Sequence, residues 1–210
     1  MAQKHGTCIA MFKPKIPPNG LIPKVRRPLL LSVYSPDRWL EISPRMNPLL
    51  RAASKADVTP IQAIYAHHVL HGTGTFETEP PDLAEMSRRH AAITEAGLPY
   101  FVAEYDGMIV GYGYAGPFRP RAAYRYTLED SIYLHPDWTG QGVGRQLLDR
   151  LMAESAHRGF KQMIAVIGDS DNRASVRLHT GAGFTETGTL RNVGYKFDRW
   201  LDVVIMQRAL

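Results

Sequence analysis

The sequence has almost no cysteine and no long apolar run. Cys8 is the only cysteine among 210 residues, which excludes an internal disulfide and any site built on several cysteines. The sequence has no stretch of about 18 apolar residues, which is the length needed to cross a membrane. The longest apolar run of the first 45 residues is Cys8 to Phe12, and the next longest is Leu29-Leu30-Leu31; both are too short for the core of a signal peptide. We therefore expect a cytoplasmic protein without a membrane partner.

The chain has little net positive charge outside its first 45 residues. The net charge is +5, but residues 1–45 hold eight Lys or Arg and two acids, whereas residues 46–210 hold 17 basic and 18 acidic residues. Seven of the fifteen prolines also lie in the first 45 residues. We expect a disordered, basic, Pro-rich extension over residues 1–46, with Met46 as an alternative start, and a folded domain over residues 47–210. The nearly neutral domain gives no reason to expect a nucleic-acid partner.

A glycine-rich segment, residues 140–145, is the most informative motif. It follows an alternating strand pattern at residues 127–134 and precedes a helical pattern at 146–157, which Gly159 ends. Glycines allow close backbone approach, and free N–H groups at a helix start bind anions. A P-loop would need Lys-Ser/Thr where Arg145-Gln146 stands, and a Rossmann fingerprint would need Gly-x-Gly-x-x-Gly in a parallel unit. The segment therefore predicts a site for a phosphate group that is neither a P-loop nor a Rossmann fingerprint.

The remaining patterns predict an α+β domain, a mixed and mostly antiparallel sheet flanked by helices. Asp106-Gly107 lies between two alternating apolar runs and marks a hairpin of residues 100–105 and 108–114. Other strands are expected at 49–53, 127–134, 161–167, 184–190 and 200–207. Helices are expected after the N-cap Asp57 as far as Leu70, and at 81–97, 146–157 and 174–180.

A hairpin, a strand, a glycine loop and a helix in this order resemble the GNAT superfamily of N-acetyltransferases. Five segments narrow the resemblance to its phosphinothricin and methionine sulfoximine N-acetyltransferase branch, and the match spans roughly residues 49–210. They are 75–80, 114–124, 126–134, 165–179 (Ala165-Val166-Ile167, Asn172 and Ser175 to His179) and 194–200. The sequence departs from the family at Thr139, where Gln or Arg is common, and at Leu148, where some members carry a Tyr that could protonate the thiolate.

The resemblance implies transfer of an acetyl group from acetyl-CoA to the α-amine of a small amino acid analogue, such as phosphinothricin, methionine sulfoximine or methionine sulfone. It implies no metal, a homodimer and a role in herbicide or antibiotic resistance. Glu129 is the expected general base, since a carboxylate is unusual in the middle of such a strand, and His179 is a second catalytic candidate. The expected cofactor-binding residues are Ile132, Tyr133, Leu134, Gly140, Gln141, Gly142, Val143, Gly144, Arg145 and Asn172. The expected substrate-binding residues are Phe76, Arg119, Arg121, Tyr124 and Ser131.

Each assignment has a structural alternative. Glu129 could be paired with Arg121 or Arg125, and the loop that holds Arg119 could simply be solvated. Asn172 could cap a helix, and His179 and Phe76 could be packing residues.

Other sites and functions also remain open. His67, His68 and His71 form a cluster, but no further ligand lies at metal-binding spacing. The segment 194–200 could line the substrate site or a dimer interface. The alternative functions are acetylation of a protein N-terminus or a polyamine, and an acyl-CoA-binding sensor without catalysis.

Overall fold

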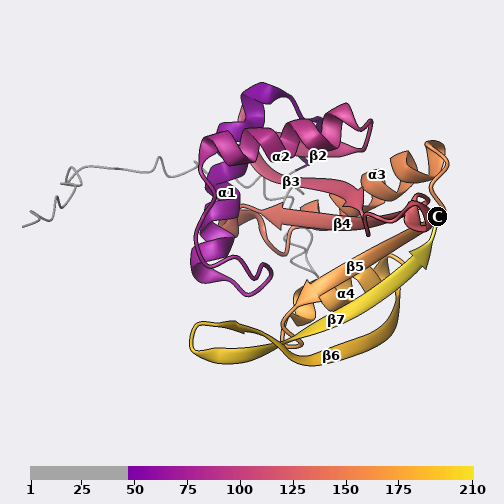
Figure 1. The fold of residues 1–210 in the computed structure, drawn as a ribbon. Coiled ribbons are helices and arrows are strands. Elements are labelled where there is room, and N and C mark those ends of the chain that lie inside the picture. Colours follow the sequence, from indigo (N-terminus) through magenta and orange to yellow (C-terminus); the bar gives the residue numbers. More distant parts are fainter. Residues whose placement is uncertain (1–46) are drawn as a thin grey trace, which may run out of the picture. The chain divides into compact units, whose positions relative to one another are not determined.

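The structure is a computed structural model that describes residues 47–210 (Figure 1). The expected Pro-rich extension over residues 1–46 and the alternative start Met46 lie outside the described residues. Within the described range, no helix combines the length and the apolar character needed to span a membrane.

Residues 47–210 form four helices and seven strands, with short 3-10 turns at Lys55–Asp57, Ala122–Tyr124 and Pro136–Trp138. The helices are α1 (Val58–His71), α2 (Leu83–Glu95), α3 (Val143–His157) and α4 (Arg173–Gly181). The strands are β1 (Leu49–Ala52), β2 (Tyr100–Tyr105), β3 (Met108–Pro117), β4 (Thr127–Leu134), β5 (Gln162–Gly168), β6 (Thr185–Lys196) and β7 (Arg199–Ala209).

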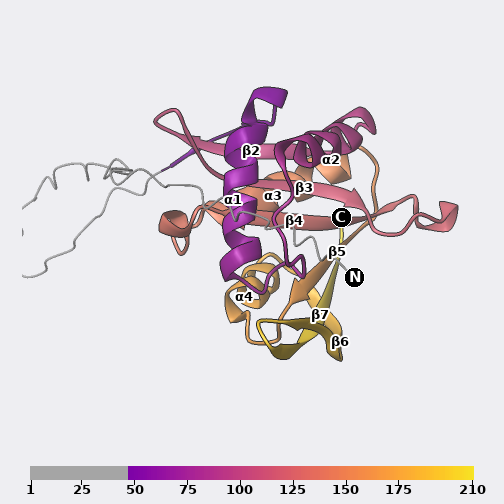
Figure 2. The ribbon, with the colours of Figure 1, turned by 60° about the vertical axis from the view of Figure 1, so that its left-hand side comes forward.

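The strands form one mixed sheet in the order β1-β2-β3-β4-β5-β7-β6, which confirms the predicted architecture. All neighbouring strands are antiparallel except β4 and β5, which are parallel. Helices α1 and α2 pack on one face of the sheet, and α3 and α4 pack on the other (Figure 2).

Alternation along β2 explains the two hydrophobic cores. Tyr100 and Val102 are buried against α1 and α2, whereas Phe101 and Ala103 are buried on the α3 face. Helix α3 supplies the second core with a stripe of apolar side chains at helical spacing: Val143, Leu147, Leu148, Leu151 and Met152.

Two elements differ from the sequence predictions. Helix α3 begins at Val143, three residues earlier than expected, because Gly142 takes a left-handed conformation (φ 85°) and serves as its N-cap. Strands β6 and β7 form one long hairpin (Figure 1). β6 continues past Leu190 through an irregular stretch that contains Asn192 (φ 53°), and the hairpin turns at Phe197-Asp198.

The parallel strands β4 and β5 pair over only half of their length. Their register runs from Thr127 opposite Gln162 to Asp130 opposite Ala165 and then stops, although β4 continues to Leu134 and β5 to Gly168. Residues 131–134 therefore keep hydrogen bonds with β3 and leave their other edge open.

Candidate active site

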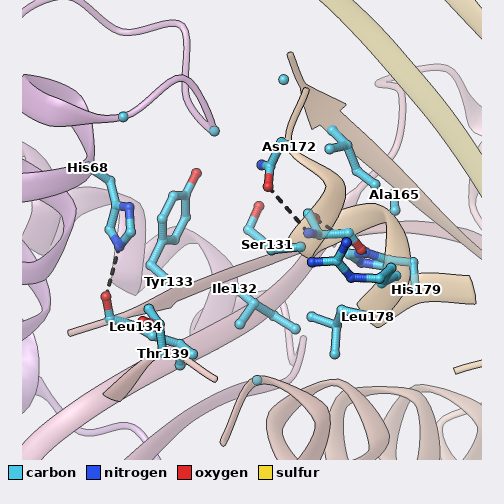
Figure 3. Close-up of a pocket in the computed structure, with 18 of the residues that line it drawn as sticks. His68, Ser131, Ile132, Tyr133, Leu134, Thr139, Ala165, Asn172, Leu178 and His179 are labelled. Atoms are coloured by element: carbon cyan, nitrogen blue, oxygen red, sulfur yellow. Dashed lines mark hydrogen bonds between the residues drawn. The ribbon is translucent and has the colours of Figure 1, made fainter. Parts of the chain in front are cut away.

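A cleft of about 690 Å³ lies where β4 and β5 separate (Figure 3). Its walls are residues 131–134 of β4, residues 165–168 of β5, the glycine loop, the start of α4 and the segment 72–74 that follows α1. The open edge of β4 offers backbone groups to an extended chain in the manner of a neighbouring strand. The predicted cofactor residues Ile132, Tyr133 and Leu134 all line this cleft.

The glycine loop closes one end of the cleft. Gly140, Gly142, Gly144 and Arg145 line it, and Gly140 (φ 72°) and Gly142 (φ 85°) have the left-handed conformation that glycine permits. The N–H groups of the first turn of α3 have no partner within the helix, so they can bind the oxygens of a pyrophosphate.

The side chains of two loop residues are engaged elsewhere, so these residues offer their backbone groups to a pyrophosphate. The side chain of Val143 is buried in the α3 core, and the Gln141 side-chain amide donates to the carbonyl of Asp137 at 2.7 Å. The Arg145 guanidinium is held by Asp149 and by the carbonyl of Gly181. Arg177, which the sequence analysis did not single out, also lines the cleft and makes no ion pair within residues 47–210. In the sequence, Arg177 could have been found from its position in residues 175–179, which are part of one of the five segments that carry the family resemblance.

Asn172 combines the two roles that the sequence left open. Its Oδ1 accepts a hydrogen bond from the backbone N–H of Ser175 at 3.3 Å, which makes it the N-cap of α4. It also lines the cleft (Figure 3). Since the cap uses only the side-chain oxygen, the amide NH₂ remains available to a cofactor.

Glu129 lies on the face of β4 that is covered by α1 and α2. Side chains alternate along a strand, and Tyr133 on the same face contacts Tyr65 of α1 with ring centroids 5.0 Å apart. Within residues 47–210, Glu129 makes no ion pair, so the alternative pairing with Arg121 or Arg125 is absent. Burial raises the pKa of Glu129, the neighbouring Asp130 adds to the rise, and Arg119 opposes it.

His179 lies on the opposite face of β4 from Glu129. Its Nε2 is 3.1 Å from Oδ2 of Asp130, and its Nδ1 is 2.8 Å from the carbonyl oxygen of Ser175. Because a carbonyl can only accept, Nδ1 carries a proton. Burial lowers the pKa of His179, but the hydrogen bond and charge of Asp130, with the Ser175 carbonyl, outweigh burial and raise it. The structure thus brings His179 to the cleft wall but does not bring it together with Glu129.

The predicted substrate-binding residues lie in three places. Ser131 lines the cleft and points to the same face of β4 as Glu129. The positive charge of Arg119 lowers the pKa of the Glu129 carboxyl. Arg121 and Tyr124 are exposed on the loop after β3 and show no contact with Glu129. Neither arginine makes an ion pair with another residue of the described part of the chain.

Phe76 lies in the loop between α1 and α2 and packs on two glycines. Three of its ring atoms lie less than 3.0 Å from where a Cβ of Gly194 would be, and a fourth contact places Cε1 at 2.9 Å from the Cβ position of Gly168. Phe76 therefore forms a wall between the end of β5 and the β6–β7 hairpin.

Sequence reasoning missed three polar contacts around the cleft. His68 hydrogen-bonds through Nε2 to the carbonyl of Leu134 at 2.8 Å (Figure 3), and burial lowers its pKa. The buried Lys196 donates from Nζ to the carbonyls of Gly72 and Thr75, both at 2.8 Å. The third contact joins Asp130 to His179, and the strand pattern of residues 127–134 gave no reason to single out Asp130. No cluster of three or more potential metal ligands occurs in residues 47–210.

Comparison with known proteins gives one consistent result. The sequence model of the acetyltransferase (GNAT) family matches residues 61–184. A phosphinothricin N-acetyltransferase of Alcaligenes faecalis is 53% identical over 161 residues, which are 77% of this chain and 82% of the relative. An L-methionine sulfoximine/L-methionine sulfone acetyltransferase of Salmonella typhimurium is 41% identical over 77% of this chain and 94% of its own. The crystal structure of a phosphinothricin acetyltransferase from Sinorhizobium meliloti in complex with AcCoA has a TM-score of 0.77 and 45% identity, and the match covers 79% of this chain and 89% of that one. The chain belongs to the GNAT family of acetyltransferases, in agreement with the resemblance seen in the sequence.

Proposed function

We propose that this protein transfers the acetyl group of acetyl-CoA to the α-amine of a small amino acid analogue, with phosphinothricin, methionine sulfoximine and methionine sulfone as the leading acceptors. One observation carries the proposal. The half-buried, unpaired carboxylate of Glu129 lies on the strand whose open edge and glycine loop form the cleft. The names of the two relatives described above supply the class of acceptor.

The cleft residues position the thioester. Backbone groups of residues 131–134 hold the pantetheine arm, and N–H groups of residues 140–145 hold the pyrophosphate, with Asn172 and Arg177 at the rim. Positioning of this kind lowers barriers by about 7–11 kcal/mol in favourable cases.

Glu129 removes a proton from the ammonium group of the acceptor, directly or through a water molecule. The neutral amine then forms a C–N bond with the thioester carbonyl, the C–S bond breaks, and the leaving thiolate takes up the proton that the new amide nitrogen loses. His179 is held by Asp130 in the opposite wall, and in its protonated form it stabilises the negative charge that develops on this side. Arg119 and Arg121 bind the acidic group of the acceptor, since a planar guanidinium suits carboxylate and phosphinate oxygens.

A thiol-release assay with acetyl-CoA tests the proposal. The acceptors are phosphinothricin, methionine sulfoximine, methionine sulfone, spermidine and a short peptide. We expect turnover confined to the three amino acid analogues. Turnover only with the peptide or with spermidine would leave the fold and the cofactor in place and would overturn the acceptor.

The proposal includes a homodimer. The β6–β7 hairpin carries five large apolar side chains that are about half exposed or more: Leu190, Val193, Tyr195, Phe197 and Trp200. Large apolar side chains gathered on one exposed element mark interaction surfaces, and a second copy of the chain is the proposed occupant. The proposal also includes a cytoplasmic location and a detoxifying role, which would give resistance to a herbicide or antibiotic because acetylation removes the charge of the α-amine.

A further inference from the structure

A second recess lies between α2 and the sheet, on the same side of the sheet as Glu129. Its volume is about 230 Å³, and four tyrosines line it (Tyr65, Tyr100, Tyr112 and Tyr114). Met86 and Ile93 of α2 cover them. Pockets that hold a whole drug-sized ligand measure about 300–1,000 Å³, so this recess suits one side chain rather than a complete ligand.

The recess begins one strand away from Glu129. Gly116 of β3 pairs with Glu129, and the next residue of β3 on that face, Tyr114, pairs with Ser131. Ile93 approaches from above, with its Cδ1 3.4 Å from the position of a Cβ at Gly116. The side chains that lie beside Glu129 in the direction of β2 are therefore Tyr114 and Ile93, and both line the recess.

Two hydroxyl groups in the recess lack a partner. Tyr100 and Tyr112 are 6% and 1% exposed, and neither hydroxyl makes a hydrogen bond with any other residue of the range 47–210. A buried tyrosine hydroxyl normally has a partner. Neither hydroxyl is among the fully buried polar atoms without a partner in this range, which are His90 Nε2, Asp130 Oδ1 and Ser155 Oγ, and both tyrosines line the recess.

The charges at the recess are already neutralised. Arg89 binds Glu77 at 2.6 Å and Glu85 at 2.7 Å, and Arg88 binds Glu85 at 2.8 Å. The recess therefore offers an apolar channel with neutral hydroxyl donors, and no free cation, to whatever enters it.

We propose that this recess receives the side chain of the acceptor while its α-amine lies at Glu129. The inference rests on the proposed function and names the acceptor class more closely: an amino acid whose side chain carries a neutral polar group toward its end, beyond a short apolar stem, as in methionine sulfone. The tyrosine hydroxyls bind that polar end, and Met86 and Ile93 contact the apolar stem.

Filling the recess from α2 tests the proposal. Ala92 is exposed at its edge, and Ala84 is exposed two turns earlier on the same helix and does not line the recess. We expect Ala92→Leu to lower kcat/KM for methionine sulfone by about tenfold or more, the usual scale of steric discrimination in an apolar pocket. The kcat/KM for alanine, which has no stem, and the Kd of acetyl-CoA should change less than about twofold, and Ala84→Leu should leave all three values unchanged.

Removing one hydroxyl provides a second measurement that does not change the volume. Tyr112→Phe should lower kcat/KM for methionine sulfone by about tenfold and leave kcat/KM for methionine unchanged, because the thioether makes no comparable hydrogen bond. The inference would be overturned if two ratios of kcat/KM kept their wild-type values: methionine sulfone to alanine in Ala92→Leu, and methionine sulfone to methionine in Tyr112→Phe. The proposed function would still stand. A wild-type protein that acetylates no amino acid would overturn the proposed function and this inference together.

Discussion

Glu129 is distinguished by what surrounds it rather than by a partner. The carboxylate is half-buried and unpaired within residues 47–210, and burial with the nearby Asp130 raises its pKa above the usual 4.5. A base must be deprotonated to act, so a raised pKa moves the acid limb of activity toward neutral pH.

Glu129→Gln should lower kcat by about 10²–10⁴-fold at neutral pH, the usual contribution of a general base. The wild type should lose kcat/KM as the pH falls through the raised pKa of Glu129, and this limb should be missing from the variant. Calorimetric titration should give an unchanged Kd for acetyl-CoA. Wild-type turnover in Glu129→Gln across the pH range would remove this residue from the mechanism.

The same pKa shift predicts that Glu129 lowers the stability of the folded protein at neutral pH although it supports catalysis. A carboxyl whose folded pKa lies above its unfolded pKa binds more protons in the folded state, so the free energy of unfolding falls as the pH rises from about 4.5 through the folded pKa. At neutral pH, Glu129→Gln should therefore unfold at the same temperature as the wild type or at a higher one. A lower melting temperature would contradict this assignment of the shift.

Gly194 and Gly188 on β6 form a matched pair of glycines. Phe76 occupies the place where a Cβ of Gly194 would lie, whereas no atom lies within 4 Å of a Cβ at Gly188. Gly194→Ala should lower the free energy of unfolding by about 1–3 kcal/mol, the usual cost of overpacking, and should raise KM for the acceptor. Gly188→Ala should change neither value appreciably. Denaturant unfolding of both variants checks this, and equal stabilities would contradict the packing of Phe76.

Two contacts tie separate elements together around the cleft. The Lys196 ammonium joins the β6–β7 hairpin to the loop that follows α1, and Asp130 joins β4 to His179 of α4. Both contacts hold walls of the cleft in place; Asp130 and His179 line the cleft themselves, whereas Lys196 does not.

Lys196→Met should lower the free energy of unfolding by about 1–3 kcal/mol, because the buried carbonyls of Gly72 and Thr75 lose their donor. Acceptor KM should rise as the Phe76 loop loosens, while the Kd of acetyl-CoA should hold. The exposed Lys161, which lies just before β5, provides the control Lys161→Met. Identical thermal melts for the two variants would contradict the assigned role of Lys196.

Local signals predicted most of the elements. The Asp82 side chain accepts from the Glu85 N–H at 2.8 Å and starts α2 as expected, and Asp106-Gly107 turns the β2–β3 hairpin. The β6–β7 turn was missed because Phe197 and Asp198 adopt φ values of 52° and 57° without the Gly or Asn that usually marks such turns.

The site was predicted unevenly for a related reason. The glycine loop is a short motif, and Glu129 stands out within its strand, so both could be found in the sequence. The contacts of His179 with Asp130 and of Lys196 with Gly72 join residues 49 and 124 positions apart. The separation of β4 and β5 likewise depends on tertiary structure. No local pattern carries such information.

At the scale of the whole molecule, the apolar β6–β7 hairpin is the proposed interface of the dimer. Trp200 is 62% exposed on β7, and Leu83 is 47% exposed at the start of α2. Trp200→Asp should convert the proposed dimer to a monomer, because a charge in an apolar interface is costly to bury. Leu83→Asp should leave the mass unchanged and suits the start of a helix. Light scattering after size exclusion measures both, and a monomeric wild type would overturn the dimer.

The division of side chains between the two faces of β4 has a consequence for how such an enzyme can diversify. Glu129, Ser131 and Tyr133 point toward α1 and α2, whereas Asp130, Ile132 and Leu134 point toward α3 and α4. If the recess beside α2 receives the acceptor, as proposed, we expect substitutions in α2 to alter what is acetylated without disturbing the residues that hold the acetyl donor. One strand in this way separates the proposed acceptor side of the catalyst from the side on which His179 and the α3 core lie, and we expect a change of acceptor to need no change in the glycine loop.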